Sequence, residues 1–88
     1  MKDWYVYMVR CSDGSLYTGI AKDVEKRVAE HNSEKTGAKY TKSRRPVRLV
    51  YREAVASRSE ASRRELAIKR LNKKQKEALI SLSQDDIS

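Results

Sequence analysis

Two tyrosines near the start of the chain, Tyr7 and Tyr17, are the residues whose type and spacing first suggest chemistry. They lie on either side of Ser12-Asp13-Gly14-Ser15, a turn sequence, and hydrophobic or β-branched residues flank that turn on both sides. The segment is therefore predicted to be a β-hairpin, which can bring the two phenols together. Two phenols beside basic side chains could transfer a proton, or they could be ordinary aromatic packing.

A second group of polar residues falls on a helix predicted to run from Val24 to about Asn32, with Asp23 as its N-cap. His31, the only histidine, lies on the apolar stripe of this helix, and Arg27 borders that stripe one turn earlier. Both therefore border the face that should meet the sheet. The simplest interpretation is structural, because a histidine near a helix C-terminus suits the dipole and an arginine can extend past a core.

Glu65 is expected at the edge of the inward stripe of a second helix, between Ala61 and Ile68. The sequence Ser57-Arg58-Ser59-Glu60 fits a capping box and should open this helix. A carboxylate in that place needs a partner, because burying a lone charge is costly, and an arginine could supply a simple salt bridge.

Convergence of two tyrosines, an arginine, a histidine and a glutamate on one basic patch would suit phosphodiester cleavage. A carboxylate can hold a divalent metal, the metal and an arginine can stabilise charge on the phosphate, and a phenol or imidazole can handle the proton.

The elements that must position these residues are a small sheet and three helices. Apolar and aromatic residues on both alternating faces of the segment from Trp4 to Val9 predict a central strand covered on two sides. The other expected elements are the partner strand Leu16 to Ile20, a loop over residues 33–46, a third strand from Val47 to Val55, and a last helix that Asn72 and Gln75 separate from the second.

The predicted fold is α/β of the α+β type: a three-stranded antiparallel sheet flanked by three helices, in the order β-β-α-β-α-α. Residues 1–82 are expected to form a single domain, because the chain is too short for two cores. Residues 83–88 are polar and acidic and are expected to form a flexible tail.

The register of the hairpin decides whether Tyr7 and Tyr17 can act together. A two-residue turn at Asp13-Gly14 would place them on opposite faces of the sheet. A three-residue loop, with Gly14 left-handed in a G1 bulge, shifts the register by one so that Tyr7 faces Gly19 and both tyrosines share a face. We therefore predict the bulged hairpin.

The net charge of +8 is a regional property. Residues 35–82 contain fifteen Lys/Arg and four Asp/Glu, whereas residues 1–34 contain five Lys/Arg and six Asp/Glu. Such a region attracts polyanions, most commonly nucleic acid, although it could also be a solvated face. The candidate nucleic-acid-binding residues are Lys35, Lys39, Tyr40, Lys42, Arg44, Arg45 and Lys69.

Cys11 is the only cysteine, so neither an internal disulfide nor a cysteine-based zinc cluster is expected. No run is apolar enough to span a membrane and no signal-peptide core is apparent, so a cytoplasmic location is predicted.

The chain resembles the GIY-YIG nuclease superfamily, in particular its small stand-alone branch of bacterial URI-domain proteins. The matching segments are Tyr5-Val6-Tyr7, Tyr17-Thr18-Gly19, Arg27 to Asn32, Gly37-Ala38-Lys39-Tyr40-Thr41 and Glu65-Leu66-Ala67-Ile68-Lys69. The resemblance extends from about Trp4 to about Leu82. It departs from the family pattern at Tyr5, where the name-giving glycine would be, and at Thr18, where isoleucine or valine is usual.

The resemblance implies an endonuclease that cuts DNA with one divalent metal, Mg²⁺ or another such as Mn²⁺. It implies that Glu65 is the metal ligand, that Arg27 contacts the scissile phosphate, that Tyr7 and Tyr17 line the site and that His31 assists proton transfer. Because the chain has no extra DNA-binding domain, cleavage selective for structure rather than sequence is expected, with a role in DNA repair or processing.

The general base is left open between Tyr7, Tyr17 and His31. A free tyrosine has a pKa of about 10, which Arg27 and a bound cation would lower, whereas histidine titrates at about 6.5. Two other functions are also open: a nucleic-acid-binding module without catalysis, in which Tyr40 stacks on bases, and an interaction domain for an acidic protein. The oligomeric state and the substrate structure are not predicted.

Overall fold

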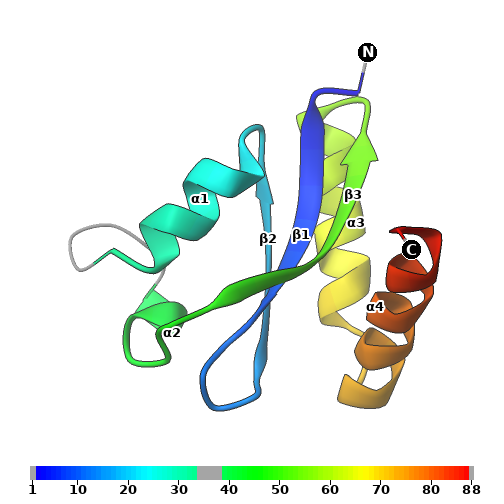
Figure 1. Ribbon diagram of the computed structural model, residues 1–88. Helices are drawn as coiled ribbons and strands as arrows, with labels where there is room; N and C mark the ends of the chain where they lie inside the picture. Colours follow the sequence, from blue (N-terminus) through cyan, green and yellow to red (C-terminus); the bar gives the residue numbers. More distant parts are fainter. Residues whose placement is uncertain (1, 34–38, 88) are drawn as a thin grey trace.

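The computed structural model describes residues 2–33 and 39–87, which form one antiparallel sheet with helices on both faces (Figure 1). The three strands follow one another across the sheet in the order β2-β1-β3. The strands are β1 (Trp4–Arg10), β2 (Leu16–Ala21) and β3 (Arg48–Val55), and the helices are α1 (Val24–His31), α2 (Lys39–Lys42), α3 (Arg58–Lys69) and α4 (Lys73–Ile87). The predicted α+β fold is confirmed.

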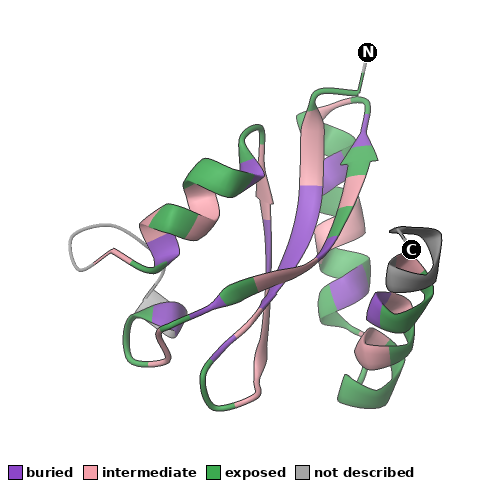
Figure 2. Cartoon of the chain, in the orientation of Figure 1, coloured by how far each residue is buried: buried purple, intermediate pink, exposed green. Residues whose placement is uncertain are grey.

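Strand β1 is central and buried on both sides, as its unbroken apolar sequence predicts (Figure 2). Val6 and Met8 point into a core that α3 and α4 cover, and both side chains are fully buried. Val9 points to the opposite face, where α1 contributes Val24. The sheet thus separates two small cores, with α1 on one side and α3 and α4 on the other (Figure 1).

The hairpin has the predicted three-residue loop. Gly14 has a φ of 85°, and its N–H donates to the Cys11 carbonyl at 3.0 Å. The Cys11 N–H donates to the Ser15 carbonyl at 2.8 Å, which closes the G1 bulge. Tyr7 is therefore paired with Gly19 and Val9 with Tyr17, so both tyrosines lie on the α1 face.

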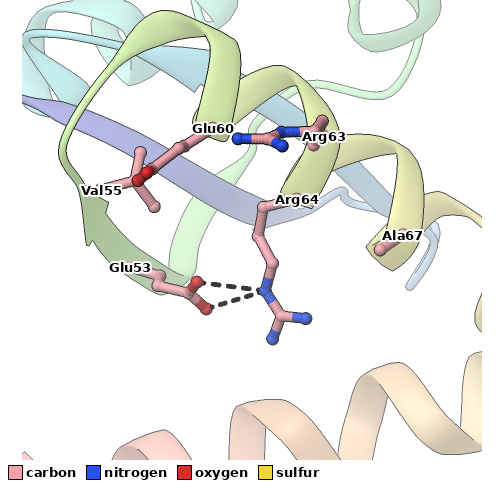
Figure 3. Close-up of a pocket in the computed structure, with 6 residues that line it drawn as sticks. All are labelled: Glu53, Val55, Glu60, Arg63, Arg64 and Ala67. Carbon is pink, nitrogen blue, oxygen red and sulfur yellow. Dashed lines mark hydrogen bonds and ion pairs between the residues drawn. The ribbon is translucent and has the colours of Figure 1, made fainter.

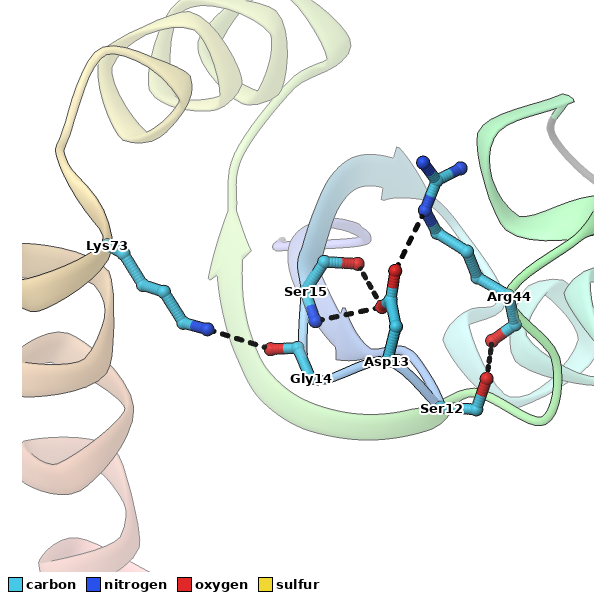
Figure 4. A network of polar contacts seen from close by, with 6 residues as sticks. All are labelled: Ser12, Asp13, Gly14, Ser15, Arg44 and Lys73. Atoms are coloured by element: carbon cyan, nitrogen blue, oxygen red, sulfur yellow. Dashed lines mark hydrogen bonds and ion pairs between the residues drawn. The ribbon is translucent and has the colours of Figure 1, made fainter.

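The tip of this hairpin is tied to two distant segments (Figure 4). The Asp13 carboxylate accepts from Arg44 Nε at 3.1 Å, and the Ser12 N–H and hydroxyl both donate to the Arg44 carbonyl. Lys73 Nζ, at the start of α4, donates to the Gly14 carbonyl at 3.2 Å. These contacts hold the loop between the α2–β3 connection and α4.

The predicted caps bound the helices. Asp23 Oδ1 accepts from the Lys26 N–H, and Asn72 and Gln75 exchange a reciprocal pair of side-chain to backbone hydrogen bonds that separates α3 from α4. Helix α3 is capped by the Ser57 hydroxyl, which accepts from the Glu60 N–H at 3.2 Å. Glu60 itself accepts from the Ala56 N–H, one residue earlier than a standard capping box places this bond.

Two boundaries differ from the prediction. The segment expected as a loop contains α2, a single turn too short to leave a hydrophobic period in the sequence. Helix α4 continues to Ile87 through residues expected in the tail, because the sequence after Ser83 contains neither glycine nor proline to end it. No helix in the described ranges is long and apolar enough to cross a membrane.

A bidentate ion pair connects the first strand to the last helix. Arg10 at the end of β1 donates from Nη1 and Nη2 to the two carboxylate oxygens of Glu77, at 2.7 and 2.6 Å. Parallel hydrogen bonds of this kind fix geometry as well as charge. The pair therefore sets where α4 lies against the sheet.

Candidate active site

Tyr7, Tyr17 and His31 converge on the α1 face of the sheet. The hydroxyl of Tyr7 lies 2.8 Å from Nε2 of His31, within hydrogen-bond distance, and the rings of Tyr17 and His31 meet edge to face with centroids 5.1 Å apart. The bulged register brings the two tyrosines to one face, and the last turn of α1 brings His31 to them.

His31 is held from both ring nitrogens. Its side chain is buried, and its Nδ1 lies 2.9 Å from the hydroxyl of Thr41 on α2. Thr41 is itself fully buried. Burial lowers the pKa of His31, the nearby Arg27 guanidinium lowers it further, and Glu30 opposes both. The imidazole is therefore neutral at pH 7, so one ring nitrogen is an N–H donor and the other an acceptor.

Tyr7 lies across the backbone of its cross-strand neighbour Gly19. A β-carbon at position 19 would lie 2.6 Å from the Tyr7 hydroxyl oxygen and 2.8 Å from Cζ, so only glycine leaves room for the ring. Burial raises the pKa of Tyr7 to about 12, Tyr17 adds to the increase, and Arg27 opposes it. Arg27 lowers this pKa, as expected, but the loss of hydration outweighs the attraction of the guanidinium, so the net shift is upward.

Arg27 lies beside the Tyr7 hydroxyl and also pairs with Glu30. Its Nη1 lies 3.0 Å from the Glu30 carboxylate, and both side chains are about one-third exposed. The hydrogen bond that Arg27 donates to Glu30 raises the pKa of Arg27 above its usual range, and the attraction of Tyr7 adds to this. Arg27 is therefore a permanent cation at the solvent side of the buried Tyr7.

Glu65 comes from α3 on the other side of the sheet and is near enough for its charge to raise the pKa of Tyr7 further. Its side chain is 24% exposed, and its carboxylate lies 3.5 Å from Lys69 Nζ, one helical turn later. Tyr7, Tyr17, Arg27 and His31 thus form one cluster, with Glu65 at its margin.

Glu65 can hold a hard cation only together with other ligands. The described residues contain no group of three or more His, Cys, Asp or Glu side chains placed to bind a metal. Mg²⁺ keeps several waters and typically binds through one or two carboxylates and the phosphates of a substrate. A single partly exposed carboxylate at the margin of the cluster fits that pattern, so the residues present are compatible with Mg²⁺ or Mn²⁺.

The predicted nucleic-acid-binding residues are distributed over several segments. The guanidinium of Arg44 is tied to Asp13, Arg45 Nε donates to the Lys42 carbonyl at 3.0 Å, and Lys42 is exposed. Lys69 is paired with Glu65. The predictions for Lys35, Lys39 and Tyr40 concern side chains outside those that the structure describes.

Sequence reasoning did not identify Thr41, Glu30 or Gly19 as site residues. Thr41 belongs to a segment predicted as a loop, so its contact with His31 had no periodic signal. Glu30 follows Arg27 by three residues on α1, a spacing that does indicate an ion pair. Gly19 could have been found from the bulged register, which places it opposite Tyr7.

A separate pocket lies between β3 and α3, with a volume of about 390 Å³ (Figure 3). Two of its four charged lining residues are paired with each other, because Arg64 Nε donates to both oxygens of Glu53 at 3.1 Å. None of the predicted site residues lines this pocket. Its lining residues are Glu53, Val55, Glu60, Arg63, Arg64 and Ala67.

The chain is similar to small bacterial proteins along most of its length. UPF0213 protein DP2720 of Desulfotalea psychrophila is 54% identical over 85 residues, which cover 97% of this chain and 77% of that protein. UPF0213 protein SSP2268 of Staphylococcus saprophyticus is 56% identical over 81 residues, which cover 92% of this chain and 98% of that protein.

Two solution NMR structures have a similar fold, each with a TM-score of 0.58. UPF0213 protein BH0048 from Bacillus halodurans is 49% identical, over 90% of this chain and 83% of that chain. Protein EF2693 from E. faecalis is 38% identical, over 93% of this chain and 91% of that chain. The family model described as the GIY-YIG catalytic domain matches residues 3–78, a range that includes every residue of the cluster and Glu65. The chain therefore belongs to the GIY-YIG nuclease family.

Proposed function

We propose that this protein is a metal-dependent endonuclease that hydrolyses phosphodiester bonds of DNA. The observation that carries the proposal is the hydrogen bond between the buried Tyr7 hydroxyl and a neutral His31, beside the Arg27 guanidinium. A proton acceptor and a fixed cation are the two groups that attack on a phosphodiester requires. Family membership supports the same reaction class.

In this proposal Tyr7 and His31 act as one proton-accepting pair. The attacking water gives a proton to the Tyr7 oxygen as the phenolic proton passes to His31 Nε2, and the water oxygen bonds to phosphorus as the P–O bond to the leaving group breaks. Tyr7 then never exists as a free phenolate, which its pKa of about 12 would make rare at pH 7. His31 suits this role because burial keeps it neutral and Thr41 fixes its ring.

Arg27 is proposed to bind a non-bridging oxygen of the scissile phosphate, where its charge is most useful as negative charge develops. To do so it must exchange or share its contact with Glu30. Glu65 would hold Mg²⁺ or Mn²⁺, which when bound would add further positive charge beside the phosphate. Tyr17 lies against the His31 ring and limits the movement of the imidazole.

The substrate is proposed to be DNA of unusual structure rather than a defined sequence, in repair or processing. The basic residues around Arg44 and Arg45 support backbone contacts, which carry no sequence information. The cytoplasmic location stays a prediction.

A non-catalytic nucleic-acid-binding module is the second candidate. One observation favours it: both Arg27 and Glu65 have a partner of opposite charge in the free chain, Glu30 and Lys69 respectively. Such pairs would keep the cluster from engaging a metal and a phosphate. In that case the protein would bind DNA without cutting it.

The experiment that separates the two candidates is Mg²⁺-dependent nicking of supercoiled DNA, with DNA binding measured in parallel. Glu65→Ala should abolish nicking and leave binding mostly intact, and Arg27→Ala should also abolish nicking. Glu60→Gln is the matched control on the same helix, because the amide can still accept from the Ala56 N–H. Equal nicking by the Glu65→Ala variant and the parent would refute the catalytic assignment.

A further inference from the structure

Two cations from different elements converge on the only tryptophan of the chain. Lys22 Nζ lies 5.5 Å from the centroid of the Trp4 ring, and the Arg58 guanidinium carbon lies 5.9 Å from it. Both distances are within the range of a cation–π interaction. Lys22 follows β2 and Arg58 begins α3, so the fold and not local sequence brings the two charges together.

Neither of these cations has a carboxylate partner among the described side chains. The ion pairs among the described residues involve other side chains, and the polar or aromatic contact seen for both Lys22 and Arg58 is the one with the Trp4 ring. Two like charges over one ring repel each other unless an anion lies between them. The ring can orient the two side chains, but it cannot neutralise them.

The opposite face of the sheet offers an instructive contrast. Arg52 lies over the Tyr5 ring at 5.8 Å, in the same kind of aromatic contact. Its Nη1, however, also lies 2.6 Å from the Glu25 carboxylate. The chain therefore supplies its own anion at Arg52 and leaves Lys22 and Arg58 to an external one.

The unneutralised pair lies at a defined distance from the active site. The start of β1, the end of β2 and the start of α3 lie at the same end of the sheet (Figure 1). Trp4 precedes Tyr7 by three strand residues, a rise of about 10 Å along β1, and the two side chains lie on opposite faces of the sheet. Arg58 precedes Glu65 by seven helical residues, again about 10 Å. One strand of duplex DNA covers about three nucleotides in that rise.

We propose that Lys22 and Arg58, oriented by Trp4, bind a backbone phosphate of the DNA strand at least about three nucleotides from the phosphate at the active site. The inference rests on the proposed function, and it names a second contact that fixes the direction of the strand across the protein. With one phosphate at Arg27 and one at this site, the strand crosses from the α1 face to the start of α3. Neither base identity nor sequence is read by such a contact.

The test is DNA binding in metal-free buffer over a range of salt, with fluorescently labelled duplex and the Lys22→Gln/Arg58→Gln double variant. One phosphate contact changes the salt slope by about 0.9, so over a roughly fourfold rise in salt the parent should lose about 3.5-fold more affinity than the variant. Arg52→Gln is the matched control: it removes one cation from an aromatic ring, and the slope should stay that of the parent. Equal slopes for parent and double variant, or the same decrease in slope in Arg52→Gln, would overturn the site.

Trp4 provides a direct readout that does not depend on cleavage. Because it is the only tryptophan, its emission should change when DNA binds to the parent and stay constant in the double variant. Constant Trp4 emission in the parent at saturating DNA would also overturn the site. A parent that binds with the expected slope but never nicks DNA with Mg²⁺ would refute the endonuclease and leave the phosphate site standing. If the parent nicks DNA and the double variant has the same salt slope of DNA binding as the parent, the phosphate site alone is refuted.

Discussion

Tyr7 lies directly over Gly19, its partner across the β1–β2 hairpin, with no room for a side chain between them. Gly19, the last residue of the segment Tyr17-Thr18-Gly19, is thus a steric requirement of Tyr7. The contact lets the Tyr7 ring stay against the sheet while its hydroxyl reaches His31. Tyr17, two residues before Gly19, lies on the same face because the hairpin is bulged.

Gly19→Ala should abolish nicking, because the added β-carbon would lie 2.6 Å from the Tyr7 hydroxyl oxygen and displace the ring from His31. Overpacking of this kind also costs about 1–3 kcal/mol of unfolding free energy. Urea denaturation and the nicking assay measure the two effects. Gly14→Ala is the control: its β-carbon meets nothing within 4 Å, so the strain of a positive φ should lower stability but leave the activity of the folded protein intact. Parental activity in Gly19→Ala would contradict the steric account.

Stability should decrease as the pH falls below about 6.5, through His31. Burial keeps the pKa of His31 in the folded state below its unfolded value, so the unfolded chain binds the extra proton first. The contribution is fully present above the unfolded pKa and is lost as the pH falls toward the folded pKa, by at most about 1.4 kcal/mol per pH unit. Urea denaturation at several pH values, compared with His31→Gln, isolates this contribution. An identical pH dependence in parent and variant would exclude His31 as its source.

Thr41→Val should slow nicking while DNA binding is retained. The substitution keeps the shape of the side chain but removes the hydroxyl that lies 2.9 Å from His31 Nδ1. We expect a loss of about 1–2 kcal/mol of stability, because a buried polar contact is removed. Thr41→Ser, which retains the hydroxyl, should restore the rate. If the serine variant were as slow as the valine variant, packing rather than the hydrogen bond would explain the loss.

Glu30→Gln should tighten DNA binding, because the Glu30 carboxylate competes with phosphate for Arg27. Partly exposed pairs of this kind contribute up to about 1 kcal/mol, so the gain should not exceed roughly fivefold. Anisotropy titration with labelled duplex measures it. Glu25→Gln removes the same charge from the same helix but frees Arg52, which lies outside the cluster, and any gain there reports net charge alone. Equal gains in the two variants would argue against a phosphate at Arg27.

Several elements could be predicted because a local rule determined them. The loop of three residues with Gly14 determined the register, and Asp23, Asn72 and Gln75 marked helix starts by their side-chain hydrogen bonds to backbone N–H groups. The α+β fold followed from the periodicity of the strands and longer helices.

Other features depend on depth and on distant contacts, which the sequence does not reveal. The pKa of Tyr7 is raised because the ring is buried under α1, whereas proximity to Arg27 alone suggested a decrease. Thr41 reaches His31 from a single helical turn that has no period of its own. The end of α4 was misplaced because a helix without a breaker has no local stop signal.

The ion pair between Arg10 and Glu77 can form only late in the synthesis of the chain. Every residue of the cluster and Glu65 is synthesised before α4 begins at Lys73. Arg10, in contrast, can pair only after Glu77 has been added, 67 positions further along the chain. On a ribosome the sheet, α1 and α3 leave the exit tunnel before α4, so α4 docks last against the end of β1. The ion pair that anchors the end of the first strand thus forms only after the side chains of the cluster and Glu65 have emerged.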